Sequence, residues 1–486
     1  MRTLRTVAIA LAAAALLLVP PPPVASAAPS QPVIVAIAAG DSHTCAVTSG
    51  GRATCWGDNG FGQLGNGTTT RSLVPVDVSR LHSGLATITA GSDHTCALTE
   101  AGRVWCWGYG AALGTGTETR HTFPVAVAGL ASGVVSISAG QMHTCALTTK
   151  GAVKCWGDST YGQLGTGTRS DSLVPVGVVG LTSRVVAVSA GGLSTCALTS
   201  TGAVLCWGYN GRGELGDGTT TDSSVPVHVS GLASGTSAIS VGDGSACALT
   251  EVGGVTCWGG GAGYSGTVPV AVPGLANGIT AVSVGGGHAC ALTPPGGVKC
   301  WGSNGFGQLG DGTPADSTVR TLPVDVVGLS SGAASIAAGH SQTCALSGGG
   351  RMRCWGGNAN GLLGNGSTSA SSTPVTVDFS VYQMVVLSPS VPAGTIGRGT
   401  TVRFTATVRP RAPAGVRPVV RFVVYRQEGG VWRLDATRDV IADEHGAVSL
   451  RWGFVTPGLR YVRARALADR VYGASSWGPL ASYEVR

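Results

Sequence analysis

From residue 33 to residue 377 the chain alternates short, β-prone runs with turns that contain glycine. The first stretch predicts four strands, at residues 35–40, 43–48, 52–57 and 74–78, with a glycine-rich loop at residues 58–67. Pro75 places the fourth strand at an exposed edge of its sheet, because proline has no N–H for a ladder. Four strands of four to six residues within about 50 residues are typical of one β-propeller blade.

The same unit occurs seven times. Successive units lie 51, 49, 51, 51, 43 and 54 residues apart, measured between their first cysteines. A period near 50 predicts a propeller or a solenoid. The second unit is shortened by two residues and the fifth lacks Gln-Leu-Gly, in both cases in the loop after Trp-Gly. We expect shortened loops and intact blades at these two places.

Each unit contains two cysteines ten residues apart. Between Cys96 and Cys106 the sequence predicts a hairpin with a three-residue turn, in which Gly102 takes the left-handed conformation. Thr99 then faces Arg103, and the cysteines form a non-hydrogen-bonded pair with Cα atoms about 4.5 Å apart, which a disulfide tolerates. The seven pairs are Cys45 and Cys55, Cys96 and Cys106, Cys145 and Cys155, Cys196 and Cys206, Cys247 and Cys257, Cys290 and Cys300, and Cys344 and Cys354.

These pairs have three interpretations: disulfides, buried free thiols or metal ligands. Zinc usually takes four ligands, whereas each unit offers two cysteines and neighbouring units hold theirs apart. Disulfides also persist outside the cytosol, where an exported chain resides. One disulfide within each unit is the preferred interpretation, and neither a metal nor another cofactor is predicted.

Three motifs recur in register: Ala-Gly-x-x-His-Thr-Cys-Ala-Leu-Thr, Trp-Gly-x-Asn-x-x-Gly-Gln-Leu-Gly and Pro-Val-x-Val. Together they resemble the regulator of chromosome condensation repeat, with close matches at residues 61–65, 161–165 and 306–310. The resemblance covers about 345 residues and implies an all-β fold, a seven-bladed β-propeller over residues 31–380. Paired cysteines are not part of the general family pattern, and they look like an adaptation to export in a secreted bacterial member.

The N-terminus has the pattern of a signal peptide, predicted over residues 1–27. Two arginines precede an apolar run at residues 7–19, and an Ala-Ser-Ala cleavage site ends at Ala27. No later stretch is apolar over 18 residues, so we expect no membrane span after cleavage. The predicted localisation is extracellular, with association with the cell envelope as an alternative.

After Asp378 the repeats stop, and residues 384–486 contain alternating runs at residues 402–408, 419–425, 447–452 and 461–466. About 100 cysteine-free residues of this kind predict an immunoglobulin-like β-sandwich, similar to domains appended to bacterial secreted proteins. The charge changes here as well. Residues 29–382 carry 14 basic and 17 acidic side chains, whereas residues 383–486 carry 15 arginines and 7 acidic residues. Tyr461, Arg463 and Arg465 share one strand face, either solvated or facing an anionic polymer of the envelope.

Four histidines share one position, two residues before the first cysteine of their units. They are His43, His94, His143 and His288, and the other units have Ser194, Ser245 and Gln342 there. A ring of histidines could bind a metal, but the replacements are hydrogen-bonding groups. We therefore interpret the histidine as a structural side chain that satisfies its turn.

Six aromatic residues lie in the loops after Trp-Gly: Phe61, Tyr109, Tyr161, Tyr209, Tyr264 and Phe306. These rings either pack against their own blades or form a contact ring on one face, since Tyr and Phe anchor interfaces. Phe61, Tyr161 and Phe306 share one register, which indicates packing. Tyr109, Tyr209 and Tyr264 fit that register less well and are the better candidates for contact with a partner.

The chain contains no Gly-x-Ser-x-Gly, His-Glu-x-x-His, P-loop or EF-hand pattern. We predict a secreted, non-enzymatic scaffold whose propeller loops bind a protein or a cell-surface glycan, and no nucleic acid. The resemblance implies two alternatives: a guanine nucleotide exchange factor, and an inhibitor of β-lactamase-type enzymes. A hydrolase or lyase is the weakest interpretation, and a cluster of acidic or histidine side chains at one channel mouth would favour it.

Overall fold

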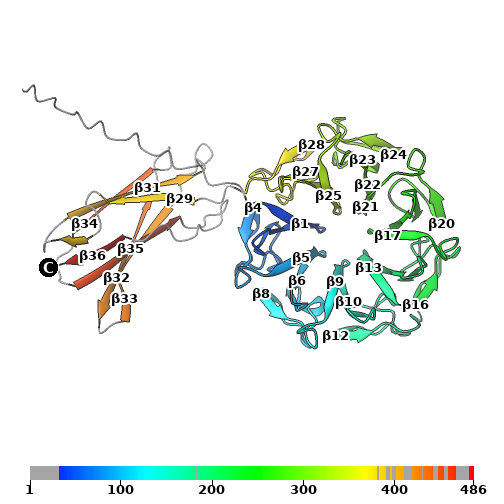
Figure 1. Ribbon diagram of the computed structural model, residues 1–486, viewed down its shortest axis with the longest axis horizontal. Coiled ribbons are helices and arrows are strands. Elements are labelled where there is room, and N and C mark those ends of the chain that lie inside the picture. Colours follow the sequence, from blue (N-terminus) through cyan, green and yellow to red (C-terminus); the bar gives the residue numbers. More distant parts are fainter. Residues whose placement is uncertain are drawn as a thin grey trace, which may run out of the picture. The chain divides into compact units, whose positions relative to one another are not determined.

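A computed structural model describes residues 32–181 and 184–379 and eight strands between residues 383 and 485 (Figure 1). The predicted signal peptide lies outside the described residues. Blades 1 to 4 comprise β1 (Ile34–Ala39), β2 (His43–Thr48), β3 (Ala53–Gly57), β4 (Ser72–Asp77), β5 (Leu85–Ala90), β6 (His94–Thr99), β7 (Val104–Gly108), β8 (His121–Ala126), β9 (Val134–Ala139), β10 (His143–Thr148), β11 (Val153–Gly157), β12 (Ser172–Gly177), β13 (Val185–Gly191), β14 (Ser194–Thr199), β15 (Val204–Gly208) and β16 (Ser223–His228). Blades 5 to 7 comprise β17 (Thr236–Val241), β18 (Ser245–Thr250), β19 (Val255–Gly259), β20 (Gly266–Ala271), β21 (Ala281–Val284), β22 (His288–Leu292), β23 (Val298–Asn304), β24 (Asp316–Asp325), β25 (Ala333–Ala338), β26 (Gln342–Ser347), β27 (Met352–Gly356) and β28 (Ser371–Thr376).

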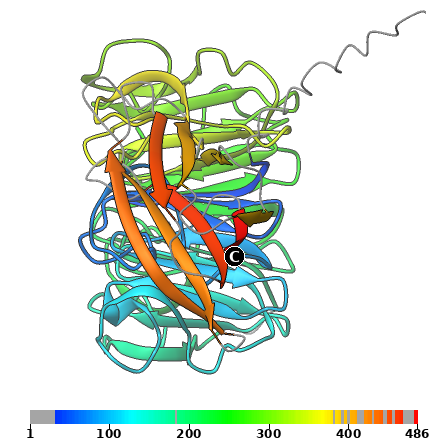
Figure 2. The ribbon, with the colours of Figure 1, turned by 90° about the vertical axis from the view of Figure 1, so that its left-hand side faces the viewer.

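These strands form seven four-stranded antiparallel sheets arranged as a closed ring, with the first strand of each blade innermost (Figure 1). In the side view of Figure 2, the strands run between the two faces of the ring. Every blade takes its four strands from one continuous stretch of chain. The ring therefore closes by contact between blade 7 and blade 1, where Trp56 Nε1 donates to the carbonyl oxygen of Leu362 at 2.9 Å.

The cysteine hairpins have the predicted register. Thr99 N–H donates to the carbonyl oxygen of Arg103 at 2.9 Å, Gly102 has φ +78°, and Cys96 pairs with Cys106. All fourteen cysteines form disulfides, one within each blade, with Cα atoms 4.0–4.1 Å apart. Each bridge joins the central two strands of its blade, so it links the inner half of the sheet to the outer half.

The two shortened units keep complete blades, as predicted. Blade 2 has β5–β8 and a single 3₁₀ turn, η1 (Gly110–Ala112), in place of the longer loop. Blade 5 has β17–β20, with only residues 260–265 between its third and fourth strands. The shortening of these two units is therefore confined to the loop, because both faces of each sheet pack against neighbouring blades.

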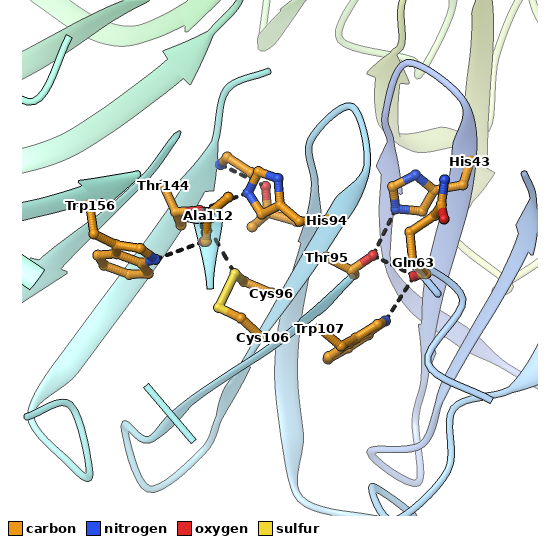
Figure 3. The surroundings of a disulfide bond; sticks show 12 residues. His43, Gln63, His94, Thr95, Cys96, Cys106, Trp107, Ala112, Thr144 and Trp156 are labelled. Carbon is orange, nitrogen blue, oxygen red and sulfur yellow. Dashed lines mark hydrogen bonds between the residues drawn. A yellow bond between two sulfur atoms is a disulfide. The ribbon is translucent and has the colours of Figure 1, made fainter. Parts of the chain in front are cut away.

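We call the contact between one blade and the next a seam. At the seams on either side of blade 2, a buried polar chain joins the neighbouring blades (Figure 3). At the seam between blades 1 and 2, Trp107 Nε1 donates to the main-chain oxygen of Gln63 at 2.8 Å. The Thr95 hydroxyl donates to the same oxygen at 2.7 Å. Because that proton is committed to Gln63, His43 Nε2 must donate to Thr95 Oγ1, at 2.7 Å.

The same arrangement repeats where histidine is present. His94, His143 and His288 contact Thr144, Thr195 and Thr343 of the following blades at 2.7–2.9 Å. The histidines are fully buried. Their structural role agrees with the sequence interpretation, but the hydrogen-bond partner lies in the next blade rather than in the histidine's own turn.

Two seams lack the histidine–threonine pair. Blades 4 and 5 have Ser194 and Ser245 in place of histidine, and the following blades have alanine in place of threonine. At the second of these seams, a Cβ added to Gly242 would lie 2.7 Å from Val284, whereas one added to Gly140 would meet the His143 ring at 2.3 Å. A valine of the next blade thus fills the space that an imidazole fills elsewhere.

The innermost strands have an open edge toward the channel, and hydroxyl groups cover part of it. Ser189 Oγ accepts the N–H of Val241 at 3.0 Å, and Ser240 Oγ accepts that of Val284 at 3.0 Å. Thr89, Ser138 and Ser283 act in the same way at 2.9–3.0 Å. These side chains reduce the number of unpaired edge groups that would otherwise recruit a further strand.

The remaining strands are β29 (Gln383–Pro389), β30 (Gly394–Ile396), β31 (Thr401–Arg409), β32 (Val419–Glu428), β33 (Val431–Ile441), β34 (Ala447–Gly453), β35 (Gly458–Ala466) and β36 (Ala481–Val485). They form a sheet of order β29-β31-β34 and a sheet of order β30-β36-β35-β32-β33. The four predicted runs fall on β31, β32, β34 and β35. Their immunoglobulin-like packing stays a prediction, and the side chains of Tyr461, Arg463 and Arg465 lie outside the described residues.

The buried histidines predict acid sensitivity. Burial lowers the pKa of His43 and His143 to about 4 and that of His94 and His288 to about 3. Above pH 6.5 the imidazole is neutral in both the folded and unfolded states. As the pH falls from 6.5 toward 4 only the unfolded chain binds the proton, so each histidine should remove about 1.4 kcal/mol of unfolding free energy per pH unit.

The test is denaturant unfolding of the wild type and His94→Gln at pH 7 and pH 5, since blade 7 already has Gln342 at this position. The variant should lose less stability between the two pH values. Burial raises the pKa of Asp41, Asp93 and Glu214, which acts in the opposite direction in both proteins, so only the difference between them is diagnostic. Equal losses would contradict the prediction.

Candidate binding face at the channel mouth

The turns between the first and second strands lie on the same face of the ring as the loops between the third and fourth strands, because the strands are antiparallel. In blade 1, Asp58 N–H donates to the carbonyl oxygen of Ser42 at 2.9 Å, and in blade 2 Tyr109 N–H donates to Asp93 at 2.8 Å. We call this surface the loop face. It carries every aromatic candidate from the sequence.

A ring of seven residues surrounds the channel mouth on the loop face. Each ring residue follows the glycine of its blade's first turn: Asp41, Ser92, Gln141, Gly192, Asp243, Gly286 and His340. Main-chain hydrogen bonds join neighbouring turns, for example Gln141 N–H to Gly192 O at 2.9 Å. Behind the ring, the first strands line a cavity of about 250 Å³.

The polar side chains of this ring bridge its glycine positions. Gln141 Nε2 donates to Asp243 Oδ1 at 2.6 Å across Gly192, and His340 Nδ1 lies 3.4 Å from Asp243 Oδ2 across Gly286. A Cβ on Gly192 would lie 2.9 Å from Asp243, and one on Gly286 would lie 2.6 Å from His340. The two glycines therefore permit a Gln–Asp–His arc over part of the channel mouth.

The surroundings raise the pKa of both Asp41 and His340, which disfavours the charged form of the aspartate and favours the charged form of the histidine. Burial raises the pKa of Asp41, although its hydrogen bond from the Ser92 hydroxyl acts against that shift. The hydrogen bond to Asp243 raises the pKa of His340, which favours the imidazolium. The channel mouth thus combines a partly desolvated carboxyl group with an ion pair.

A second acidic group lies at the seam between blades 1 and 2. Gln63 Nε2 donates to Asp58 Oδ2 at 2.9 Å and to Asp93 Oδ1 at 3.3 Å, so one neutral amide holds two carboxylates together. Burial, followed by the charges of Asp58 and Asp41, raises the pKa of Asp93. Within the described ranges, neither Asp58 nor Asp93 forms an ion pair with lysine or arginine. This seam offers unneutralised acceptor oxygens to a cationic or hydrogen-bonding partner.

Asp41, Asp243 and His340 form an acidic and histidine cluster at the channel mouth, the feature that would favour a hydrolase or lyase, and no sequence motif identified these residues. Its members lie one per blade, so no short motif joins them. Their positions in the repeat do have a common feature, because Asp41, Asp243 and His340 each follow the glycine of Ala-Gly or Val-Gly at the end of a predicted first strand. Among the described residues, no group of three His, Cys, Asp or Glu side chains could hold a metal ion. The arrangement can bind polar or cationic groups through carboxylate and imidazole atoms.

The six aromatic candidates lie at the outer part of the loop face. Phe61 contacts Tyr109 edge-on with ring centroids 5.6 Å apart, and Tyr161 contacts Tyr209 with centroids 5.0 Å apart. Each pair crosses a seam. Phe306 has no such partner within the described part of the chain and is 55% exposed, while Phe61 is 39% exposed.

The exposed fractions of the rings therefore give a different order of candidates from their positions in the repeat. Phe61 and Phe306, which share the packing register, are the more exposed, and Tyr109 and Tyr209 are half-buried against a neighbouring ring or loop. Which rings contact a partner stays a prediction, and because of their exposure Phe61 and Phe306 become the first candidates.

Tyr264 has an internal role. At six seams a glycine N–H in the loop of one blade donates to the outer strand of the next, as Gly218 does to Thr267 at 2.8 Å. The short loop of blade 5 lacks that glycine. Instead, Tyr264 Oη donates to Thr321 O, the equivalent carbonyl oxygen in blade 6, at 2.8 Å. The tyrosine hydroxyl replaces a missing main-chain bond.

The fold defines a seven-bladed β-propeller, and its loop face is polar at the channel mouth and carries aromatic side chains at its outer part. Comparison with protein-family models matches residues 18–267 to the RCC1-like domain, which is more than half of the chain. The Regulator of chromosome condensation (RCC1) repeat matches residues 279–308, 295–346 and 333–362. The chain belongs to the family of RCC1-like repeat domain proteins.

Two plant relatives illustrate the extent of this similarity. The Ultraviolet-B receptor UVR8 of Arabidopsis thaliana is 31% identical over 201 residues, which are 40% of this chain and 46% of the receptor. The mitochondrial RCC1 domain-containing protein RUG3 of the same plant is 32% identical over 239 residues, 46% of this chain and 54% of that protein. The chain thus spans about half the length of these two curated relatives.

Among solved structures, Prp20p from Saccharomyces cerevisiae superposes with a TM-score of 0.61 at 21% identity, covering 70% of this chain and 90% of Prp20p. Its published description concerns binding to Gsp1p and histones. At this identity the likeness shows the propeller fold alone. Among the described residues, no helix is long and apolar enough to cross a membrane.

We predict that Tyr264→Phe destabilises the protein by about 1 kcal/mol, because it removes one hydrogen bond across a seam and keeps the ring. Tyr209→Phe is the matched control, since the Tyr209 hydroxyl forms no hydrogen bond with the described residues. Denaturant unfolding should separate the two variants. Equal stability of both would show that the Tyr264 hydroxyl does not hold the seam.

Proposed function

We propose that this protein is an exported, non-enzymatic scaffold that binds a partner protein through its loop face. The observation that carries the proposal is that Asp58 and Asp93, which have no lysine or arginine partner among the described residues, lie at the same seam as the Phe61–Tyr109 pair. Aromatic rings supply contact area at interfaces, and unneutralised carboxylates select for complementary charge. A cell-surface glycan is the alternative partner.

Three features support export. Every cysteine is committed to a disulfide, which persists in oxidising compartments. The first 27 residues have the pattern of a signal peptide. The basic residues 383–486 add a net charge of +8, which suits retention near anionic envelope polymers.

The scaffold has the rigidity that such a role requires. Hydrogen bonds to main-chain carbonyl oxygens hold the loops at six of the seven seams, so the loop face is largely preorganised before it meets a partner. Preorganisation reduces the ordering cost of binding. The carboxylates and rings can therefore contribute to affinity directly.

The test begins with capture of partners from culture supernatant and envelope fractions by the mature chain, followed by affinity measurement with Phe61→Ala and Phe306→Ala. Each variant should weaken binding by about 2 kcal/mol, roughly 30-fold, with little change in melting temperature. Val252→Ala is the control, because Val252 is 73% exposed in the turn between β18 and β19, on the opposite face. A binding loss in the control alone would place the interface on that other face.

A guanine nucleotide exchange role is a less favoured alternative. The likeness to Prp20p shows the fold and not its binding properties, and export separates this chain from cytosolic GTPases. We expect the mature protein to leave nucleotide release from a panel of small GTPases unchanged at micromolar concentration. Clear acceleration would reverse the order of the two proposals.

A further inference from the structure

The wall of the channel is irregular on the blade 1 side. Near the end of five innermost strands a side-chain hydroxyl accepts a main-chain N–H of the next blade at 2.9–3.0 Å, and these residues are Thr89, Ser138, Ser189, Ser240 and Ser283. Blades 7 and 1 have Ala337 and Ala38 at this position. The hydroxyl acceptor is therefore missing for two N–H groups, those of Ala39 and Ala90.

The strand register turns both of these N–H groups toward the channel. In blade 1 the N–H of Gly40 makes the ladder bond, to the carbonyl oxygen of His43 at 2.9 Å, so Ala39 belongs to a non-hydrogen-bonded pair and faces away from β2. Ala90 has the same register in blade 2. Among the described residues neither N–H has an acceptor, so two donors stand free in the channel wall.

A ligand has access to these donors. Both line the cavity of about 250 Å³ inside the innermost strands, and the ring residues at the channel mouth line the same cavity (Figure 1). The arc that ends at His340 spans blades 3 to 7, whereas Asp41 and Ser92 border the mouth over blades 1 and 2. The side chain of His340 is itself 50% exposed, so the cavity opens on the loop face.

The charges at the mouth favour a cationic ligand. Asp41 and Asp243 both line the cavity, and within the described ranges neither forms an ion pair with lysine or arginine. His340 pairs with Asp243, while Asp41 accepts from the neutral hydroxyl of Ser92. Carboxylates at the opening of a cavity attract cations. Because no three described His, Cys, Asp or Glu side chains could hold a metal ion, an organic ammonium group is the cation that fits.

The wall below the mouth favours neutral oxygen atoms. A residue in a non-hydrogen-bonded pair turns both its N–H and its carbonyl oxygen to the same side, so the free edge of β1 and β5 offers donors and acceptors together. A hydroxyl group can accept from the N–H and donate to the carbonyl oxygen. A carboxylate can only accept, and Asp41 and Asp243 would repel it.

We propose that the blade 1 side of the channel binds an amino sugar, a molecule that joins an ammonium group to several hydroxyl groups. The ammonium group donates to the Asp41 carboxylate, and two sugar oxygens accept from the N–H groups of Ala39 and Ala90. Pockets for drug-sized ligands begin at about 300 Å³, so this cavity suits a single sugar ring. The inference goes beyond the proposed protein partner and does not depend on it.

The probe is D-glucosamine, titrated at pH 7 into the mature chain labelled with ¹⁵N at alanine. Substitution of each residue by glycine assigns the amide signals of Ala39 and Ala90. Both amide protons should move downfield as they gain an acceptor, with half-saturation at about 1 mM, which is the affinity that a ligand of this size allows. Ala139, Ala190 and Ala338 are internal controls, because hydroxyl groups already accept their N–H. Their signals should move less.

Two further compounds test the class of ligand. D-Glucose lacks the ammonium group and should bind at least about tenfold more weakly, because it loses a charge-assisted hydrogen bond. Glycine has the ammonium group and adds a carboxylate, and it should leave both alanine signals in place. Binding of glucose as tight as that of glucosamine, or a response to glycine, would show that the ligand is not an amino sugar.

Ala38→Ser tests the free N–H groups. The new side chain restores the hydroxyl that five other blades have, so the Ala90 N–H should gain an acceptor without ligand and its signal should already lie downfield. Glucosamine should then bind about tenfold more weakly. The fold should be retained, because the equivalent residues in blades 3 to 6 are serines. Unchanged affinity together with the shifted Ala90 signal would rule out a role for this N–H.

Asp41→Asn tests the carboxylate and keeps the test decisive if the serine variant fails to fold. It should weaken glucosamine binding about tenfold and leave the binding of glucose unchanged. Asp325→Asn is the matched control, since that side chain is 81% exposed on the outermost strand of blade 6. Equal affinity of Asp41→Asn and the control would contradict the proposal.

The absence of any shift of Ala39 and Ala90 at glucosamine concentrations well above the expected half-saturation would overturn the proposal outright. The titration needs no natural partner. Its failure would therefore leave partner capture by the loop face intact, and failure of capture would leave the glucosamine result intact.

Discussion

A main-chain carbonyl oxygen that receives the tryptophan indole at six of the seven seams is the interaction on which the rest of the structure depends. It accepts the tryptophan indole and, at most seams, a threonine hydroxyl of the next blade. A four-stranded blade cannot bury both faces alone, so the ring exists only when every blade meets a neighbour. The bond ties the glycine-rich loop of one blade to the centre of the next, and so the same contacts that close the ring also fix the loop face.

Chemistry within the seams varies while their geometry is preserved. At the seams that follow blades 4 and 5, histidine and threonine are lost together, and at the second of these Val284 occupies the space of the imidazole. Where a glycine N–H is lost, the Tyr264 hydroxyl bonds to the equivalent carbonyl oxygen. These replacements involve side chains on both sides of a seam. Among the described residues, hydrogen-bond pairing is incomplete around blade 5, where the short loop brings no acceptor to the buried indole of Trp301.

The loop face gains its character from what the ring brings together. Residues that follow equivalent glycines converge on the channel mouth, and two glycines leave space for the Gln141–Asp243–His340 arc. Asp58 and Asp93, far apart in sequence, become neighbours, and neither has a lysine or arginine partner in the part of the chain that the structure describes. A surface of this kind selects partners by charge and by polar geometry, with the aromatic rings at its outer part adding contact area.

The sequence by itself determined what depends on local spacing: the hairpin register, the seven cysteine pairs, the number of blades and the shortened loops. A disulfide between Cys96 and Cys106 needs only a ten-residue hairpin, which the chain forms wherever it lies. The tertiary structure decided the rest, because it depends on contacts between blades. The partner of His43 lies 52 residues away, and the acceptor for Trp56 lies 306 residues away. The exposure of Phe61, the acidic channel mouth and the unpartnered indole of Trp301 likewise exist only once neighbouring blades meet.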